Sequence, residues 1–135
     1  MKYKCDYELV KGYKADSGFD VRCSYDFTLK PFEVKNVNTS LFLKLYRNME
    51  AQVRPKSSVS SMGVLVHFGT VDSGYRGEVL VTMQNLNNKD VTFSKGQKIA
   101  QIVFSKKSYV NLHRLEEIED DTERGKGGFG STGKF

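Results

Sequence analysis

The feature that most constrains the fold of this chain is the alternation of apolar and polar residues in short runs. From Phe19 to Phe27 apolar residues occupy every second position, and within Glu78–Gln84 the residues Val79, Val81 and Met83 share one face. A period of two residues predicts strands with one buried face. Further candidate strands are Tyr3–Val10, Glu33–Val37, Leu41–Leu45, Ala51–Arg54, Val64–Phe68, Lys98–Phe104 and Asn111–Glu116.

Turn-forming residues separate these runs. They lie at Lys30–Pro31, Asn36–Ser40, Asn85–Asp90 and Ser94–Gly96. Many short strands spaced by about 8–12 residues predict an all-β barrel or jelly roll. The best helical candidate is a brief stretch around Val59–Met62, so we expect at most one short helix.

Length and composition exclude several classes of protein. A chain of 135 residues suits one domain, and it contains no run of eighteen apolar residues that could cross a membrane. The first residues form no apolar segment typical of a signal peptide, so we expect a cytoplasmic protein. Cys5 and Cys23 lack metal-ligand spacing, and we expect both to be reduced thiols.

The charge of the chain is modestly basic, with a net charge of +5. Such an excess fits either an ordinary solvated surface or attraction of an anionic ligand. The basic residues are scattered and the one dense charge run, Glu116–Glu123, is acidic, so we expect no nucleic-acid partner. His67 and His113 are isolated, and the chain has neither a P-loop of the Walker type nor a Cys/His zinc pattern.

The composition changes after Asp121. Residues 124–135 hold five of the twelve glycines, and Phe129 is their only large apolar residue before the terminus. Composition alone would fit a disordered tail. The order of residues also fits a phosphate-gripping lid, because glycines allow backbone N–H groups to converge on an anion and Arg124 adds a fork of donors.

A second candidate segment is Gly69–Val79, which has the signature of a hairpin or loop with glycines at both ends. An open hairpin offers backbone donors and acceptors to a planar ligand, with Asp72 beside that ligand and Tyr75 against it. The alternative is an ordinary turn with Asp at a turn position.

Three more segments are compatible with ligand binding or with plain structure. Arg54–Gly63 carries two cations and four serines in a loop that leads into the candidate helix. Gln101 lies among apolar residues of a candidate strand, where it must find polar partners in the protein or in a ligand. Asp20 opens a strand after the turn Ala15–Gly18.

Together and in this order, the five segments resemble the five motifs of the homotrimeric dUTPase family, from Ala15 to Gly133. The matching stretches are Ser17–Val21, Pro55–Ser58, Gly69–Gly77, Gly96–Gln101 and Arg124–Gly133. The third and fifth are the most specific. Lys56 stands where the family usually has Arg, which keeps the charge but loses the bidentate fork, and Ser58 stands where Gly is common.

The resemblance implies a jelly-roll-like β-barrel over residues 1–121, a flexible glycine-rich lid over residues 122–135, and a homotrimer whose three active sites are shared between chains. It implies hydrolysis of dUTP to dUMP and pyrophosphate, which limits uracil incorporation into DNA and supplies dUMP for dTMP synthesis. Asp72 would be the general base that activates the attacking water. Mg²⁺ would be held by phosphate oxygens and waters, with Asp20 touching it through water.

The resemblance also assigns substrate contacts. Those to uracil and deoxyribose would come from Gly69, Thr70, Val71, Tyr75 and Phe129, and those to the phosphates from Lys56, Ser57, Ser58, Gln101, Arg124, Gly130, Ser131 and Thr132. Two alternatives remain beside this interpretation. One is dCTP deaminase, which shares the fold but usually has a longer chain without the full fifth motif. The other is a regulatory protein-binding module of the same fold, using Glu116–Glu123 or Tyr46–Glu50.

Overall fold

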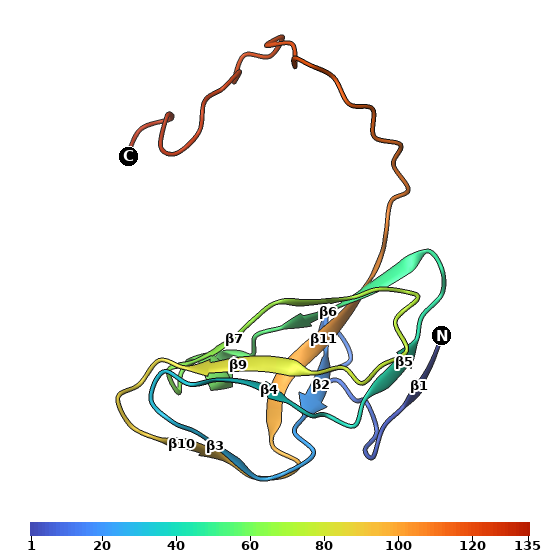
Figure 1. The fold of residues 1–135 in the computed structure, drawn as a ribbon, viewed down its shortest axis with the longest axis vertical. Helices are drawn as coiled ribbons and strands as arrows, with labels where there is room; N and C mark the ends of the chain where they lie inside the picture. The colour runs from blue at the N-terminus through green and yellow to red at the C-terminus, as the bar shows by residue number, and fades with distance from the viewer.

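The computed structural model of the chain describes residues 1–135 and consists of short strands with one short helix (Figure 1). The strands are β1 (Lys2–Lys4), β2 (Phe19–Arg22), β3 (Phe27–Leu29), β4 (Val34–Val37), β5 (Phe42–Lys44), β6 (Met49–Arg54), β7 (Val64–Val66), β8 (Gly69–Val71), β9 (Val81–Asn85), β10 (Val91–Phe93) and β11 (Lys98–Lys106). The helix, α1, covers Ser57–Ser60.

The strands form four antiparallel sheets in which most neighbours are distant in sequence. The largest has the order β2-β11-β6-β8, and a second has the order β4-β9-β7. Two pairs, β1-β5 and β10-β3, complete the barrel. The long strand β11 lies between β2 and β6, so three segments that are far apart in the sequence are neighbours in one sheet. The prediction of an all-β, jelly-roll-like fold with at most one short helix is confirmed.

The core is built by the alternation seen in the sequence. In β6 Ala51 and Val53 are buried while Gln52 and Arg54 lie on the opposite face, and in β9 Val81 and Met83 are fully buried. These residues belong to one cluster of 21 buried apolar residues. Cys5 and Cys23 are free thiols. A single contiguous core is what fixes the sheets against one another.

The strands with clear alternation are confirmed, the three-residue strands β5 and β7 among them, whereas β10 was missed and β8 was expected only as part of a hairpin or loop. The structure divides Phe19–Phe27 between β2 and the start of β3, limits the first strand to Lys2–Lys4, and begins α1 two residues before the candidate stretch. β8 and β10 have three residues each, too few for a period to be read.

The predicted strand at Asn111–Glu116 is wrong. No residue after β11 belongs to a strand or helix, and the segment leaves the barrel as an extended arc (Figure 1). The reason is that no strand of the same chain lies beside it to supply hydrogen bonds. Its apolar side chains are consequently exposed: Tyr109, Val110, Leu112, Leu115 and Ile118. No helix of the structure has the length and apolar character needed to cross a bilayer.

Candidate active site

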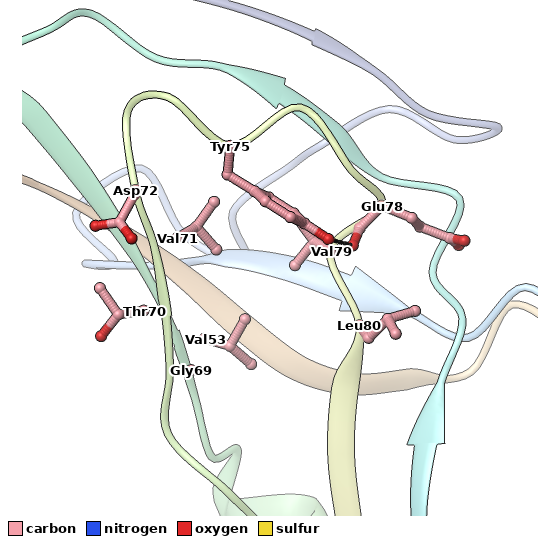
Figure 2. Close-up of a pocket in the computed structure, with 9 residues that line it drawn as sticks. All are labelled: Val53, Gly69, Thr70, Val71, Asp72, Tyr75, Glu78, Val79 and Leu80. Carbon is pink, nitrogen blue, oxygen red and sulfur yellow. Dashed lines mark hydrogen bonds between the residues drawn. The ribbon is translucent and has the colours of Figure 1, made fainter.

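A pocket of about 240 Å³ opens between the two arms of the segment that follows β7 (Figure 2). One arm is β8, and the other is the returning stretch Glu78–Leu80. The residues that line the pocket are Val53, Gly69, Thr70, Val71, Asp72, Tyr75, Glu78, Val79 and Leu80. Its volume lies below the ~300 Å³ at which ligand pockets usually begin, so it suits one ring of a larger ligand.

The pocket exists because the two arms pair with other segments instead of with each other. β8 pairs along one edge with β6, Gly69 opposite Val53 and Val71 opposite Ala51. The returning arm is bound elsewhere: Val79 donates its backbone N–H to the carbonyl of Leu41 at 2.8 Å. The facing backbone edges are therefore left without a strand partner, and such groups need hydrogen bonds from water or a ligand.

Asp72 and Tyr75 lie at the tip that joins the arms. Tyr75 donates its backbone N–H to the carbonyl of Asp72 at 3.0 Å, and its hydroxyl donates to the carbonyl of Glu78 at 2.9 Å. The ring reaches across the mouth of the pocket while the exposed Asp72 carboxylate lies on the β8 side (Figure 2). A Cβ atom on Gly77 would lie 2.4 Å from the Tyr75 hydroxyl, so only glycine leaves room for this ring position.

A second group of polar side chains lies on the four-stranded sheet. Gln101 of β11 is directly opposite Asp20 of β2 on one side and Arg54 of β6 on the other. Direct partners of neighbouring strands share a face, so the three side chains form a row. Gln101 is half-buried, and it donates its Nε2 to the carbonyl of Pro55 at 3.0 Å, so its amide has a polar partner within the protein.

Asp20 is the carboxylate of this row, and only 5% of its surface is exposed. Lys56 donates to Oδ1 at 2.8 Å, and Lys98 Nζ lies 2.6 Å from Oδ2. Burial by itself raises the pKa of Asp20, but the hydrogen bond from Lys56 and the positive charges of both lysines outweigh it and hold the pKa below its ordinary range. The Lys98 contact is an ion pair without hydrogen-bond geometry, because Oδ2 accepts no hydrogen bond.

Lys98 is a residue of this group for which the sequence analysis gave no role. It precedes an irregularity in the pairing of β11 with β2, where the register shifts between Lys98 and Ala100. Such bulges re-aim side chains, and here the cation meets Asp20. In the sequence, the feature that singles out Lys98 is its place in the fourth motif, three residues before Gln101.

The residues around Asp20 fit Mg²⁺ only in a restricted way. No group of three His, Cys, Asp or Glu side chains forms a cage for a metal. The Asp20 carboxylate is already opposed by two cations, which disfavours direct coordination. Its Oδ2 keeps acceptor capacity that a metal-bound water could use. The donor set therefore fits an ion that arrives with a polyphosphate and keeps its waters.

Ser57 and Ser58 follow Lys56 at the start of α1. Both are exposed, and neither hydroxyl makes a hydrogen bond within the chain. The predicted phosphate contacts and the predicted metal contact are thus neighbours, but none of them lines the pocket between the hairpin arms. These residues are Lys56, Ser57, Ser58, Gln101 and Asp20.

The expected lid residues are not brought to either group. Arg124 donates its Nε to the carbonyl of Gly127 at 3.0 Å, and Phe129 is fully exposed with φ of 49°. Gly130, Ser131 and Thr132 are exposed as well. No hydrogen bond or ion pair joins residues 110–135 to the barrel (Figure 1). The candidate residues of one chain therefore form three separate groups.

Comparison with known proteins gives the family. The dUTPase family model matches residues 8–133. The deoxyuridine 5'-triphosphate nucleotidohydrolase of Clostridium kluyveri is 40% identical over 124 residues, which cover 90% of this chain and 86% of that protein. The same enzyme of Neorickettsia sennetsu is 41% identical, over 89% of this chain and 83% of its own.

Solved structures share the fold. The dUTPase of Staphylococcus bacteriophage 80alpha with dUpNHpp aligns with a TM-score of 0.91 at 22% sequence identity, over 98% of both chains. Fold, ordered motifs and relatives agree, and the chain belongs to the dUTPase family.

Proposed function

We propose that this protein is a dUTP diphosphatase, a hydrolase of the acid anhydride bond that converts dUTP to dUMP and pyrophosphate. The observation that carries the proposal is the pocket held open between β8 and Glu78–Leu80, with Asp72 at its mouth. The activity printed for the relatives from Clostridium kluyveri and Neorickettsia sennetsu supports it.

The pocket suits a uracil ring. Its floor is apolar, with Val53, Val71 and Val79, and the edge of Gly69–Val71 supplies backbone donors and acceptors. Uracil would complete these hydrogen bonds, whereas cytosine would present a donor opposite a donor. A site of this kind discriminates by factors on the order of 10⁴, because the wrong base leaves buried groups unpaired. Tyr75 would pack under the deoxyribose and leave no room for a 2′-hydroxyl.

Asp72 is the proposed general base. It would take a proton from a water that attacks the α-phosphorus in line with the departing pyrophosphate. The new P–O bond forms as the bond from the α-phosphorus to the bridging oxygen breaks, and pyrophosphate leaves with the bonding electrons. Positioned base catalysis of this type contributes about 10²- to 10⁴-fold.

The polar residues around Asp20 would bind the phosphates. They are Lys56, Ser57, Ser58 and Gln101. Mg²⁺ bound to the triphosphate would offset its negative charge, with Asp20 holding one of the metal's waters. Lys56 would have to share its charge between Asp20 and a phosphate, since its ammonium already contacts that carboxylate. Lys provides a point charge there in place of the planar fork of Arg.

A homotrimer with shared sites would explain why the three groups lie apart in one chain. Val110, Leu112, Leu115 and Ile118, in the segment after β11, are exposed in their own subunit, and burial against a neighbouring copy would remove them from water. The following residues 122–135 would then close as a lid over a neighbour's site. Phe129 would stack on uracil, and Arg124, Gly130, Ser131 and Thr132 would hold the γ-phosphate.

Pyrophosphate release from dUTP, dCTP, dTTP and UTP, each with Mg²⁺, tests the activity. We expect turnover of dUTP and at least about a thousandfold lower kcat/KM for the others. Ammonia release from dCTP would instead support the deaminase, and a folded protein that turns over none of the four would support the protein-binding module. Sedimentation equilibrium tests the trimer, and a monomer at micromolar concentration would contradict shared sites.

A further inference from the structure

The Glu78 side chain fastens the returning arm of the hairpin to the loop 38–40. Its Oε1 accepts the backbone N–H groups of Thr39 at 3.0 Å and Ser40 at 2.7 Å, and its Oε2 accepts from Asn38 Nδ2 at 2.8 Å. The carboxylate points away from the pocket, on the side opposite Asp72 (Figure 2). Three donors on one carboxylate make charge-assisted hydrogen bonds, which are stronger than neutral ones.

The backbone of the same arm is held by the same loop. Thr39 donates its Oγ1 to the carbonyl of Val79 at 2.5 Å and accepts the N–H of Leu41 at 3.2 Å. Thr39 and Val79 are both buried. Ser40 adopts a positive φ of 58°, a conformation that is uncommon for a residue with a side chain. The loop thus takes a costly shape in which two successive N–H groups meet one anion.

These bonds decide the width of the pocket. The arm Glu78–Leu80 could pair with β8 as in a closed hairpin, which would use up the backbone groups that face the ligand. It pairs with residues 39–42 instead, and Glu78 supplies the side-chain part of that attachment.

Glu78 also sets the position of Tyr75. The Tyr75 hydroxyl donates to the Glu78 carbonyl at 2.9 Å, so a shift of Glu78 moves the acceptor that holds the ring. The contact chain therefore runs from loop 38–40 through Glu78 to Tyr75, which faces the proposed sugar position.

We propose that Glu78 is a positioning residue that sets discrimination between deoxyribose and ribose nucleotides by holding the returning arm and Tyr75 in place. This inference rests on the proposed hydrolysis of dUTP. The Glu78 carboxylate is bonded to loop 38–40 and points away from the pocket, so it would act through Tyr75 and the arm rather than by touching the base or the sugar.

The test is the ratio of kcat/KM for dUTP to that for UTP, measured with Mg²⁺ in wild type, Glu78→Gln, Asn38→Ala and a control, Glu33→Gln. Gln cannot accept from both sides as the carboxylate does, so we expect the ratio to fall by about tenfold to a hundredfold in Glu78→Gln. Asn38→Ala removes one donor and should lower it less. Glu33 is the matched control, because it also accepts a backbone N–H, from Lys30 at 2.8 Å, but lies outside the hairpin.

Thermal unfolding of each variant separates selectivity from stability. A folded Glu78→Gln protein with the wild-type ratio overturns the inference, and so does an equal fall in Glu33→Gln. Should Glu78→Gln fail to fold, Asn38→Ala decides, since its side chain is exposed and an unchanged ratio there overturns the inference too. A wild-type protein without dUTP turnover would overturn the proposed function itself.

A double-mutant cycle with Tyr75→Phe checks the route of the effect. The measured quantity is again the ratio of kcat/KM for dUTP to that for UTP. If Glu78 acts through the Tyr75 hydroxyl, the fall of this ratio in the double variant should be clearly smaller than the product of the falls in Glu78→Gln and Tyr75→Phe. A fall in the double variant equal to the product of the two single falls would contradict that route.

Discussion

Lys56 Nζ lies 2.8 Å from Oδ1 of Asp20, which joins the start of α1 to β2 across 36 residues of sequence. The pair is reinforced by Lys98 on the other oxygen of the same carboxylate. A nearly buried carboxylate between two partly exposed lysines is held ionised, and it keeps the Lys56 side chain beside Gln101. Asp20 of the first motif and Lys98 of the fourth motif thus position Lys56 of the second motif.

The stability of the protein should depend on pH through Asp20. Its pKa in the folded state lies below the ordinary aspartate value of 3.8, so the pair contributes stability that is present above about pH 4. That contribution is lost as the pH falls through the lower, folded-state pKa. Asp20→Asn should cost about 1–3 kcal/mol at pH 7 and show a flatter decline in acid, measured by urea unfolding from pH 7 to pH 2. Parallel pH profiles for wild type and variant would contradict this.

Asp72→Asn should abolish most turnover without affecting the fold. Asp72 is exposed and its carboxylate makes no ion pair, so the amide costs little stability. If it is the general base, kcat should fall by about 10²- to 10⁴-fold with KM for dUTP nearly unchanged. Asp90→Asn, an exposed carboxylate in the turn before β10, is the control and should keep full activity. Near-normal turnover of Asp72→Asn would refute the assignment.

Gly77→Ala should relax the preference for dUTP over UTP, because the new methyl group occupies the place of the Tyr75 ring. Displacing Tyr75 would open space for a 2′-hydroxyl, and we expect the ratio of kcat/KM values to fall by about tenfold or more. Gly74→Ala is the matched control in the same tip, since nothing lies within 4 Å of its added Cβ. Equal ratios in the two variants would contradict the role given to Tyr75.

Removal of residues 124–135 should lower kcat/KM by about a hundredfold or more and leave the barrel and its assembly intact. The reason is that these residues bond only to one another and to the adjacent Thr122, and not to the core. Activity and sedimentation of the truncated protein check this, and Phe129→Ala should reproduce part of the loss as a higher KM. Dissociation of the truncated protein into monomers would show that the segment is structural.

Mixing two variants of reduced activity tests sharing of sites between chains. Asp72→Asn and Phe129→Ala place the defects in the hairpin and in the lid, groups that do not meet within one chain. Refolding the two together should restore part of the activity, because some sites would take both intact groups from different copies. No recovery beyond the sum of the separate proteins would contradict shared sites.

Much of the fold could be predicted from sequence because burial acts residue by residue along a strand. The alternation in Val79–Met83 and in Ala51–Val53 matches the buried face of the structure. β8 and β10 could not be predicted from it, since each has only three residues and neither lies within a longer alternating run, as β5 and β7 do. Asn111–Glu116 has the pattern of a strand, but a strand also needs a partner, and its own subunit offers none.

The sequence by itself determined the fold class, the order of the five motifs and the chemical types available: a carboxylate at 72, hydroxyls at 57 and 58, and glycines in the tail. Only the tertiary structure decided that Asp20 is shared by Lys56 and Lys98 and that Glu78 holds the hairpin open. The physical reason is that these contacts join segments 36 to 78 residues apart, and their geometry depends on strand register and a bulge. Spacing along the chain contains no information on either.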